Sequence, residues 1–280
     1  MSAIVPNYNY ARYLQDRLET VTAQTLPLYE LIVLDDCSSD NSLHMIQEFL
    51  TQCDVPCRLE INERNSGSVF RQWQKGAVMA RGDLVWIAEA DDLAEPEFLE
   101  RLILFFENPE VVLAYSQSKQ IDENDNLLAN DYLAYTNDVG DYWRQNYVVN
   151  GKEEIKRALC IKNTIPNVSG VLFRRSTLVH ILNDAAADMI EMKVAGDWVL
   201  YLRLAASGKV AYHARSMNVH RRHLASVTKV NNHLEEVISV QKLAASLTSI
   251  APEQLSQMKS YAKQLRQHFD QVAGRRNDQI

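Results

Sequence analysis

The sequence predicts an α/β fold in which helices flank a mostly parallel central sheet and a helical extension follows at the C-terminus. Short apolar runs rich in β-branched residues alternate with segments of helical spacing through the first half. Such alternation is typical of parallel strands that are joined by helices. Beyond His233 the pattern changes to apolar residues at intervals of three and four, which indicates an amphipathic helix.

The first half contains four expected strands and two expected helices. The strands are Ser2–Val5, Glu30–Leu34, Cys57–Ile61 and Leu84–Ala88. The helices are marked by apolar residues that share one face, namely Leu14, Leu18 and Val21 in the first and Leu43, Ile46 and Leu50 in the second. In open parallel sheets a ligand binds beyond the carboxyl ends of the strands, so a site is expected there.

The second half is less regular. Residues 121–150 are polar and aromatic without a stable period, which predicts loops or a partly ordered flap over a site. A helix near Lys152–Cys160, a strand at Val168–Arg174 and a helix at Asp197–Ala206 are expected next. The tail helix at 255–272 is expected to pack on this or a neighbouring domain, with a membrane-surface or coiled-coil role as the alternative.

The charge of the chain excludes one class of function. The 280 residues include 36 Asp and Glu against 29 Lys and Arg, a net charge of −7. Because broad binding to nucleic acid relies on Lys and Arg that neutralise phosphates, no nucleic-acid partner is expected. Seven of the acids lie between Asp83 and Glu100, a stretch without Lys or Arg, and the rest of the chain is balanced at 29 of each sign. The acid excess is therefore local.

Cysteine usage and hydropathy predict a cytoplasmic protein. The four cysteines form no paired C-x-x-C set, and no apolar run approaches the roughly 20 residues that span a bilayer. The start, MSAIVPNYNY, lacks the basic and apolar regions of a signal peptide and enters a strand at once. We therefore expect a reduced, cytosolic protein, peripheral at the inner membrane face if the tail helix binds lipid, and a domain cut from a longer polypeptide.

Carboxylates crowd the end of the fourth strand. Leu84–Ala88 runs directly into Glu89, Ala90, Asp91 and Asp92. Neighbouring carboxylates raise each other's pKa unless a cation neutralises them, and hard oxygen ligands suit Mg²⁺ or Mn²⁺. The motif indicates a metal site or, alternatively, a solvated acidic turn before the next helix.

A second acidic turn follows the second strand. Asp35 and Asp36 end the strand, and the small polar loop at 37–39 comes next. Asp36 is placed to accept hydrogen bonds from a base imide or a ribose hydroxyl. Bonding to the backbone of its own turn is the simpler alternative.

Six segments, in their order and spacing, carry a resemblance to a known family: IVPNYNYARYL, ELIVLDDCSSDNS, NERNSGSVF, ARGDLVWIAEADD, SGVLFRR and GDWVLYLRLAASGKVAYH. Together they resemble the glycosyltransferases of family 2, which have the nucleotide-sugar-binding GT-A fold. The resemblance covers Ser2 to about Thr228. It implies a domain at 1–228, with a nucleotide-binding half at 1–117 and an acceptor-binding half at 118–228, before the extension at 229–280.

The resemblance implies a binding site for a nucleotide-sugar donor. The residues that it places there are Pro6, Asn7, Tyr8, Asp36, Asn65, Gly67, Arg71, Glu89, Ala90 and Asp91. Tyr8 is expected to stack on the base, and Asp36 to contact the base or ribose. The run after Asn65-x-Gly67 departs from the family, and Arg71 lies in it as a group that would offset diphosphate charge.

The resemblance also implies a divalent metal, Mn²⁺ or Mg²⁺, that bridges the donor diphosphate. Glu89-Ala90-Asp91 takes the place of the family's D-x-D motif, with Glu for the first Asp, and Asp91 or Asp92 would hold the ion. His223 resembles the His of a late R-x-H-x-x-S motif that includes Ser226. It is a further candidate ligand, since neutral imidazole suits Mn²⁺ better than Mg²⁺; hydrogen bonding within a loop is the alternative.

A catalytic base and an acceptor pocket complete what the resemblance implies. Asp197 occupies the position of the base in inverting relatives, although Gly196 precedes it where the family usually has Glu. A carboxylate there takes the proton of the acceptor hydroxyl during attack, while capping of its helix is the structural alternative. Asn167, Ser169 and Trp198 are expected at the acceptor, with Trp198 either a sugar platform or a packing residue.

The expected activity is transfer of a sugar, with inversion, from a UDP- or dTDP-sugar to a hydroxyl of a saccharide or lipid-linked saccharide in surface polysaccharide biosynthesis. Two other classes stay open. A sugar-nucleotide nucleotidyltransferase shares the alternating sheet but needs a Gly-rich phosphate loop after the first strand, which PNYNYARYL lacks. A catalytically silent nucleotide- or glycan-binding module would bind such ligands without turnover.

Overall fold

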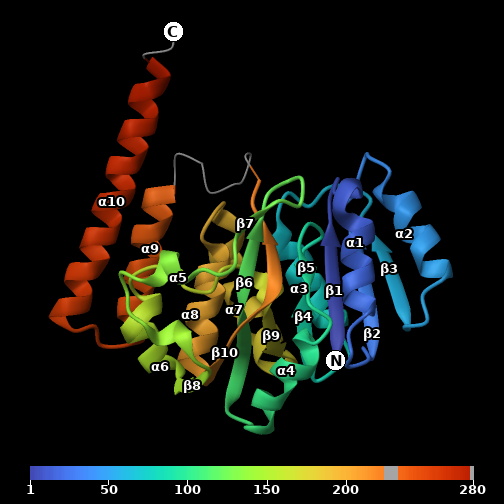
Figure 1. The fold of residues 1–280 in the computed structure, drawn as a ribbon, viewed down its shortest axis with the longest axis horizontal. Coiled ribbons are helices and arrows are strands. Elements are labelled where there is room, and N and C mark those ends of the chain that lie inside the picture. Colours follow the sequence, from blue (N-terminus) through green and yellow to red (C-terminus); the bar gives the residue numbers. More distant parts are fainter. Residues whose placement is uncertain (224–232, 278–280) are drawn as a thin grey trace.

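One mixed sheet with helices on both faces makes up the body of the protein (Figure 1). The computed structural model describes residues 1–223 and 233–277. Its strands are β1 (Ser2–Asn7), β2 (Glu30–Asp35), β3 (Cys57–Ile61), β4 (Leu84–Ile87), β5 (Leu93–Ala94), β6 (Val111–Ile121), β7 (Leu127–Ala129), β8 (Tyr147–Asn150), β9 (Val171–Arg174) and β10 (Lys209–Arg221). Its α-helices are α1 (Ala11–Thr22), α2 (Ser42–Thr51), α3 (Val69–Met79), α4 (Phe98–Ile103), α5 (Leu133–Thr136), α6 (Gly151–Glu154), α7 (Arg175–Glu191), α8 (Gly196–Ser207), α9 (His233–Leu247) and α10 (Pro252–Asn277).

The order of the strands brings several carboxyl ends to one edge of the sheet. The path is β3-β2-β1-β4-β9-β6-β10-β5, with β7 beside β6 and β8 beside β10. The strands β1 to β4 are parallel, and β9 is antiparallel to both β4 and β6, so β6 and β10 run in the same direction as β4. The loops after β1, β2, β4 and β10 therefore meet at the same edge.

Two apolar cores, one on each face of the sheet, hold these layers together. Alternate residues of a strand point to opposite faces, and Ile4 accordingly packs in one core while Ala3 and Val5 pack in the other. The first core is covered by α3, α7, α8 and α9, and the second by α1, α2 and α4. The predicted α/β fold with a central sheet and flanking helices is confirmed. Over the described ranges of the chain, the parallel pairings join β1 to β2 and β4, β2 to β3, and β6 to β10, and the other pairings are antiparallel.

The structure differs from the expected elements in the second half. The strand expected at Val168–Arg174 begins only at Val171, because 168–170 form a short 3₁₀ turn. The stretch 121–150 is not only loop, since it contains β7, α5 and β8, which are short and pair at the sides of long strands. The halves expected at 1–117 and 118–228 share one sheet, because β6 runs across residue 117.

The C-terminal extension consists of two helices that lie at the opposite end of the sheet from α2 (Figure 1). Met258, Tyr261 and Leu265 of α10 pack against the first core, so the tail helix covers its own domain. The boundary expected at 228 lies outside the described residues, as does Ser226 of the late motif. In the part of the chain that the structure describes, no helix is long and apolar enough to cross a membrane.

Candidate functional site

The residues predicted to bind the donor's base and ribose begin at the end of β1. Pro6 and Asn7 are buried, and the Asn7 side-chain amide donates to Asp35 Oδ2 at 2.8 Å and to Ser38 Oγ at 3.1 Å. Tyr8 follows with 45% of its surface exposed. Pro6 and Asn7 thus fix the strand end, and Tyr8 is the member of this set whose ring is open to a ligand.

Asp36 fixes the wall beside this strand end. Its carboxylate accepts hydrogen bonds from Asn62 Nδ2 (2.5 Å), from the backbone N (2.9 Å) and Oγ (2.7 Å) of Ser66, and from Gln72 Nε2 (3.0 Å). The side chain is buried. Asp36 therefore ties the loop after β3 and the helix α3 to the end of β2, a role beyond the turn bonding that its sequence position suggested.

The next three predicted residues lie in the turn before α3 and at the start of that helix. Asn65 Oδ1 accepts from the backbone N of Gly67 at 2.7 Å, and its amide donates to the Asp36 carbonyl at 3.2 Å. Gly67 has φ +72°, a left-handed conformation that suits glycine. Asn65 and Gly67 thus shape the turn, while Arg71 is exposed on the first turns of α3.

The acidic motif after β4 has three differently placed members. Ala90 is buried, and Glu89 Oε1 accepts from Trp73 Nε1 at 2.6 Å. Burial first, and then the charge of Asp91, raise the pKa of Glu89 to about 8. Trp73 lies in the run that departs from the family pattern, and its indole N–H gives the Glu89 carboxylate a hydrogen-bond donor.

Asp92 joins the two halves of the sheet edge. It is 3% exposed, and its oxygens accept from Asn167 Nδ2 at 2.5 Å and from the backbone N of Arg221 at 2.9 Å. Burial and the neighbouring Asp91 raise the pKa of Asp92 to about 7. Each oxygen already has a protein donor, so Asp92 serves as a structural link between the end of β4 and the end of β10.

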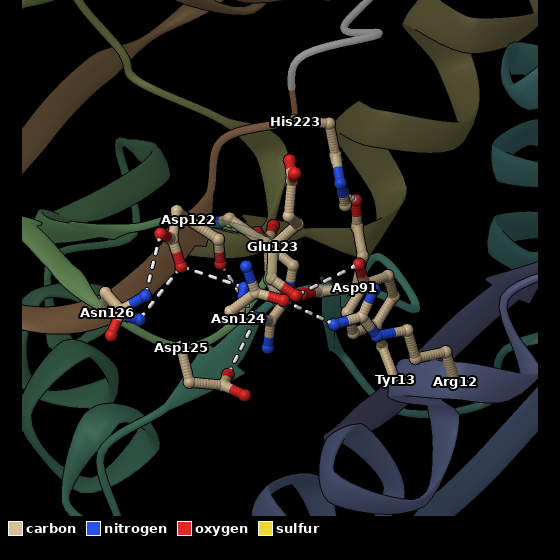
Figure 2. A network of polar contacts seen from close by, with 11 residues as sticks. Arg12, Tyr13, Asp91, Asp122, Glu123, Asn124, Asp125, Asn126 and His223 are labelled. Carbon is tan, nitrogen blue, oxygen red and sulfur yellow. Dashed lines mark hydrogen bonds and ion pairs between the residues drawn. The ribbon is translucent and has the colours of Figure 1, made fainter.

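Asp91 and His223 face each other across the site (Figure 2). His223 Nε2 lies 2.7 Å from Asp91 Oδ2, and the side chains are 21% and 17% exposed. The hydrogen bond to Asp91 raises the pKa of His223. Among the described residues no group of three ligating side chains is clustered for a metal. One carboxylate, with water and phosphate oxygens to complete the shell, fits Mg²⁺ or Mn²⁺, and an imidazole ligand suits Mn²⁺ better than Mg²⁺.

Arg221 fixes the backbone that carries Asp91. Its Nε donates to the Asp91 carbonyl at 2.7 Å, its Nη1 donates to Asp125 Oδ1 at 2.7 Å, and its guanidinium lies 4.4 Å from the Tyr13 ring centre. Figure 2 shows the turn at 122–126 and the helix α1 converging on this point, where Arg12 Nη2 also donates to Asn124 Oδ1 at 2.9 Å. The motif R-x-H drew attention to this Arg, but its partners come from segments far apart in the sequence.

Arg17 is a buried charged residue that belongs to none of the six sequence segments named above. It is fully buried, none of its three guanidinium nitrogens has a hydrogen-bond partner, and it lies 4.9 Å from the Trp86 ring centre. Burial lowers its pKa to about 10, against the attraction of Asp92 and Asp91, so it stays protonated at neutral pH. The position was visible in the sequence, because Arg17 falls between Leu14 and Leu18 on the apolar face of α1.

Asp197 lies in the first turn of α8. Its Oδ1 accepts from the backbone N of Trp198 at 2.7 Å and its Oδ2 from Asn163 Nδ2 at 3.1 Å. Burial raises the pKa of Asp197 to about 6, because the two donors offset only part of the desolvation. The carboxylate is thus ionised at neutral pH and has a pKa suited to exchanging a proton.

The residue before Asp197 explains one departure from the family pattern. A Cβ atom on Gly196 would lie 2.4 Å from Cζ of Phe70 and 3.1 Å from the carbonyl oxygen of Met189. The Phe70 ring thus occupies the space that a side chain at 196 would need. Glu, the usual neighbour of the base in the family, does not fit beside this ring.

The predicted acceptor residues are engaged within the protein. Trp198 is 2% exposed and donates from Nε1 to the Leu159 carbonyl at 2.8 Å, so packing is the role that the structure gives it. Ser169 is fully buried, and its Oγ accepts from the backbone N of Glu89 at 3.0 Å. Asn167 is half-buried between Asp92 and Asn218. A buried ring and a buried hydroxyl offer no surface to a sugar. Ser169 instead holds the backbone at Glu89, and Trp198 packs in the core beneath Asp197.

Known proteins resemble this chain in sequence and in fold. A sequence model described as "Glycosyl transferase family 2" matches residues 2–182. An uncharacterized glycosyltransferase of Nostoc sp. is 26% identical over 261 residues, which is 89% of this chain and 69% of that protein.

The enzyme TarS of Staphylococcus aureus, a poly(ribitol-phosphate) β-N-acetylglucosaminyltransferase, is 28% identical over 108 residues, 38% of this chain and 18% of TarS. The crystal structure of its residues 1–349 with UDP-GlcNAc superposes with a TM-score of 0.68 at 15% identity and covers 96% of this chain and 72% of that one.

A second solved structure has the same fold. It is the mannosyltransferase PcManGT of Pyrobaculum calidifontis with GDP-Man and Mn²⁺, with a TM-score of 0.61 at 15% identity over 93% of this chain and 68% of that one. The family match covers more than half of the chain, and the superpositions extend the fold over nearly all of it. The chain belongs to glycosyl transferase family 2, and it is a glycosyltransferase of the GT-A fold.

Proposed function

We propose that this protein transfers a sugar from a UDP- or dTDP-sugar to a hydroxyl of a saccharide or lipid-linked saccharide, with inversion, in surface polysaccharide biosynthesis. The observation that carries the proposal is the pairing of Asp91 with His223 at the edge of the sheet where β1, β2 and β4 end. This edge is where open α/β sheets bind their ligands. The solved relatives with UDP-GlcNAc and GDP-Man support a nucleotide-sugar donor.

The donor would lie along the loops after β1 and β4. Tyr8 offers an exposed ring for stacking on the base, and the Asp36 network sets the wall beside it. Asp91 and His223 would hold Mn²⁺ or Mg²⁺ next to the diphosphate, with Asp92 and Arg221 keeping Asp91 in place. The ion, when bound, stabilises negative charge on the departing nucleoside diphosphate.

Asp197 would act as the general base. Its ionised carboxylate accepts the proton of the acceptor hydroxyl while the hydroxyl oxygen attacks the anomeric carbon from the face opposite the diphosphate. A single displacement of this kind inverts the anomeric centre. Asn163 holds the carboxylate on the side away from Trp198 N, so one hydrogen bond fixes each oxygen.

The proposed acceptor rests on the named substrate of TarS, and the proposed location on the free cysteines of this chain. TarS is named for transfer to poly(ribitol-phosphate), which supports a surface polymer or its precursor as the acceptor. The four cysteines, Cys37, Cys53, Cys57 and Cys160, are free thiols, which suits the reducing cytoplasm. We propose a cytoplasmic enzyme whose lipid-linked acceptor brings it to the inner face of the membrane.

Release of nucleoside diphosphate tests this function. The purified chain is incubated with UDP-GlcNAc, UDP-glucose, dTDP-glucose or GDP-mannose, with and without Mn²⁺, and release is followed by chromatography. We expect Mn²⁺-dependent release from a UDP- or dTDP-sugar. Binding in a thermal-shift assay without release, even with added saccharide acceptors, would instead indicate a silent binding module.

The rate of transfer is expected to rise with pH through about 6. The pKa of Asp197 is raised to about 6 by burial, and only the ionised form accepts a proton. Below that pH the value of kcat/KM should fall about tenfold per pH unit, and above about 7 it should level off. A profile of kcat/KM between pH 4.5 and 8 measures this, and a rate that is flat down to pH 5 would contradict the assignment.

A further inference from the structure

A carboxylate from the C-terminal extension binds the loop that leads to Asp197. Glu236, in the first turn of α9, accepts hydrogen bonds from the backbone N of Lys193, Val194 and Ala195, each at 2.9 Å. One oxygen takes the first bond and the other takes the remaining two. Hydrogen bonds from N–H groups to an ionised carboxylate are about twice as strong as those between neutral groups.

The position of these three amides gives the contact its significance. They lie between the end of α7 at Glu191 and the start of α8 at Gly196. These amides precede α8 and lie outside its backbone hydrogen bonds, and Glu236 provides their acceptors. Glu236 thus accepts from three consecutive backbone amides, and the last of them belongs to Ala195, two residues before Asp197.

A second contact of α9 reaches the other side of Asp197. Gln241 is buried and donates from Nε2 to the Ile161 carbonyl at 2.9 Å and to the Met258 carbonyl at 3.2 Å. Ile161 lies two residues before Asn163, the residue that donates to Asp197 Oδ2. α9 therefore contacts both chain segments that hold the carboxylate.

Packing fixes α9 in the place from which it makes these contacts. Val237 and Val240 are buried in the same core as Trp198 and Val199 of α8. Both Glu236 and Gln241 are thus presented by a helix that is anchored between them, rather than by a mobile segment. A site residue held through rigid secondary structure keeps its geometry better than one held through a loop alone.

We propose that Glu236 is a positioning residue for Asp197, so that the first helix of the C-terminal extension is part of the site that activates the acceptor. The proposal rests on the proposed role of Asp197 as the base. Glu236 does not touch the reacting atoms. It sets the path of the backbone at 193–195 and thereby the direction in which the Asp197 carboxylate points.

A graded series of variants tests the proposal. Glu236→Ala removes all three bonds, and Glu236→Gln keeps one carbonyl oxygen as an acceptor and supplies no charge. Glu235→Gln is the matched control, because it removes the same charge at the exposed neighbouring position. The measurements are kcat and donor KM for the nucleotide sugar that the wild type turns over, and hydrogen exchange of the amides of 193–195.

We expect Glu236→Ala to lower kcat about 10- to 100-fold, the loss typical of a catalytic group displaced by about 1 Å. In the same variant donor KM should stay within about twofold of the wild-type value, and amide exchange at 193–195 should rise at least about tenfold. The values of kcat and amide exchange for Glu236→Gln should lie between those of Glu236→Ala and the wild type. Glu235→Gln should match the wild type in all three measurements. A Glu236→Ala protein with wild-type kcat would overturn the proposal, whether or not exchange increases.

Two further outcomes are separated by the same data. If Glu236→Ala lacks a cooperative thermal transition, Glu236→Gln decides the question, and wild-type kcat in that variant would overturn the proposal. If Asp197→Asn keeps full activity, the proposed base is wrong, and the proposal for Glu236 fails with it even where exchange shows that Glu236 holds the loop. A loss of kcat in Asp197→Asn without any loss in Glu236→Ala leaves the base intact and rejects Glu236 alone.

Discussion

Asp197→Asn is expected to lower kcat for sugar transfer by about 10²- to 10⁴-fold, the range that general base catalysis contributes. The Asn side chain has nearly the same shape and its Oδ1 still accepts from one of the two donors, Trp198 N or Asn163 Nδ2, but it cannot take the acceptor's proton. Donor KM should change by less than about twofold, because the predicted donor contacts come from the loops of β1, β2 and β4. Initial rates with the wild type and the variant under equal donor saturation measure the effect.

The same variant is expected to lose activity but to gain stability. Because the pKa of Asp197 is raised in the folded protein from 3.8 to about 6, folding favours the protonated form. The contribution of Asp197 to stability is therefore full below about pH 4 and is lost as the pH rises through 6. At pH 7 Asp197→Asn should raise the free energy of unfolding by on the order of 1–3 kcal/mol. A variant that is both inactive and more stable than the wild type excludes misfolding as the cause.

Asp91→Ala is expected to abolish the Mn²⁺-dependent part of donor binding and to lower kcat/KM by at least about 10²-fold, since a bound ion contributes several kcal/mol to the stabilisation of leaving-group charge. The carboxylate of Asp91 is partly exposed, and it is the one in the motif that faces His223. Thermal shift with UDP in the presence and absence of Mn²⁺ measures the binding term. If UDP binding by Asp91→Ala depended on Mn²⁺ as it does in the wild type, Asp91 would not be a ligand of the ion.

Asp83→Ala is the matched control for this prediction. Asp83 belongs to the same acidic stretch but is exposed at the start of β4, away from the carboxyl ends of the strands. Its removal changes the net charge by the same amount. We therefore expect wild-type UDP binding and wild-type kcat/KM from Asp83→Ala, which separates a local contact of Asp91 from a general effect of charge.

The regular parts of the fold could be predicted from periodicity. The strands that became β1 to β4 could be predicted as short apolar runs, because β1, β2 and β4 are buried on both faces of the sheet. The helices that became α1 and α2 could be predicted from their apolar faces, because each covers the sheet with one side. The short strands β7 and β8 could not be predicted, since they exist only through pairing with β6 and β10. Pairing between distant segments leaves no local period.

The site divides in the same way. The acidic strand ends were visible as motifs, but the roles of neighbouring acids within one motif were not. Asp91 faces His223, whereas Asp92 is buried and accepts from Asn167 and from the backbone N of Arg221, and all of these partners come from segments far away in the sequence. The role of Trp198 could not be predicted either, because only the packing of α8 decides whether its ring is open to a sugar or buried.

Residues that act through other residues were the hardest to predict. Glu236 and Asn163 lie in different segments from Asp197, and neither belongs to a motif. Their roles depend on tertiary contacts that single-sequence reasoning does not reach. Arg17 is the exception, because a charge on the apolar face of a helix is a local anomaly that a reader of the sequence can notice.

The most direct measurement compares nucleoside diphosphate release by the wild type and by Asp197→Asn at donor and Mn²⁺ concentrations where thermal shift shows equal binding. It isolates the central claim, that the sheet edge binds a nucleotide sugar and that Asp197 carries the chemistry. The account predicts equal thermal shifts and a rate of release at least about 10²-fold lower in Asp197→Asn. Equal rates of release from the two proteins would contradict it.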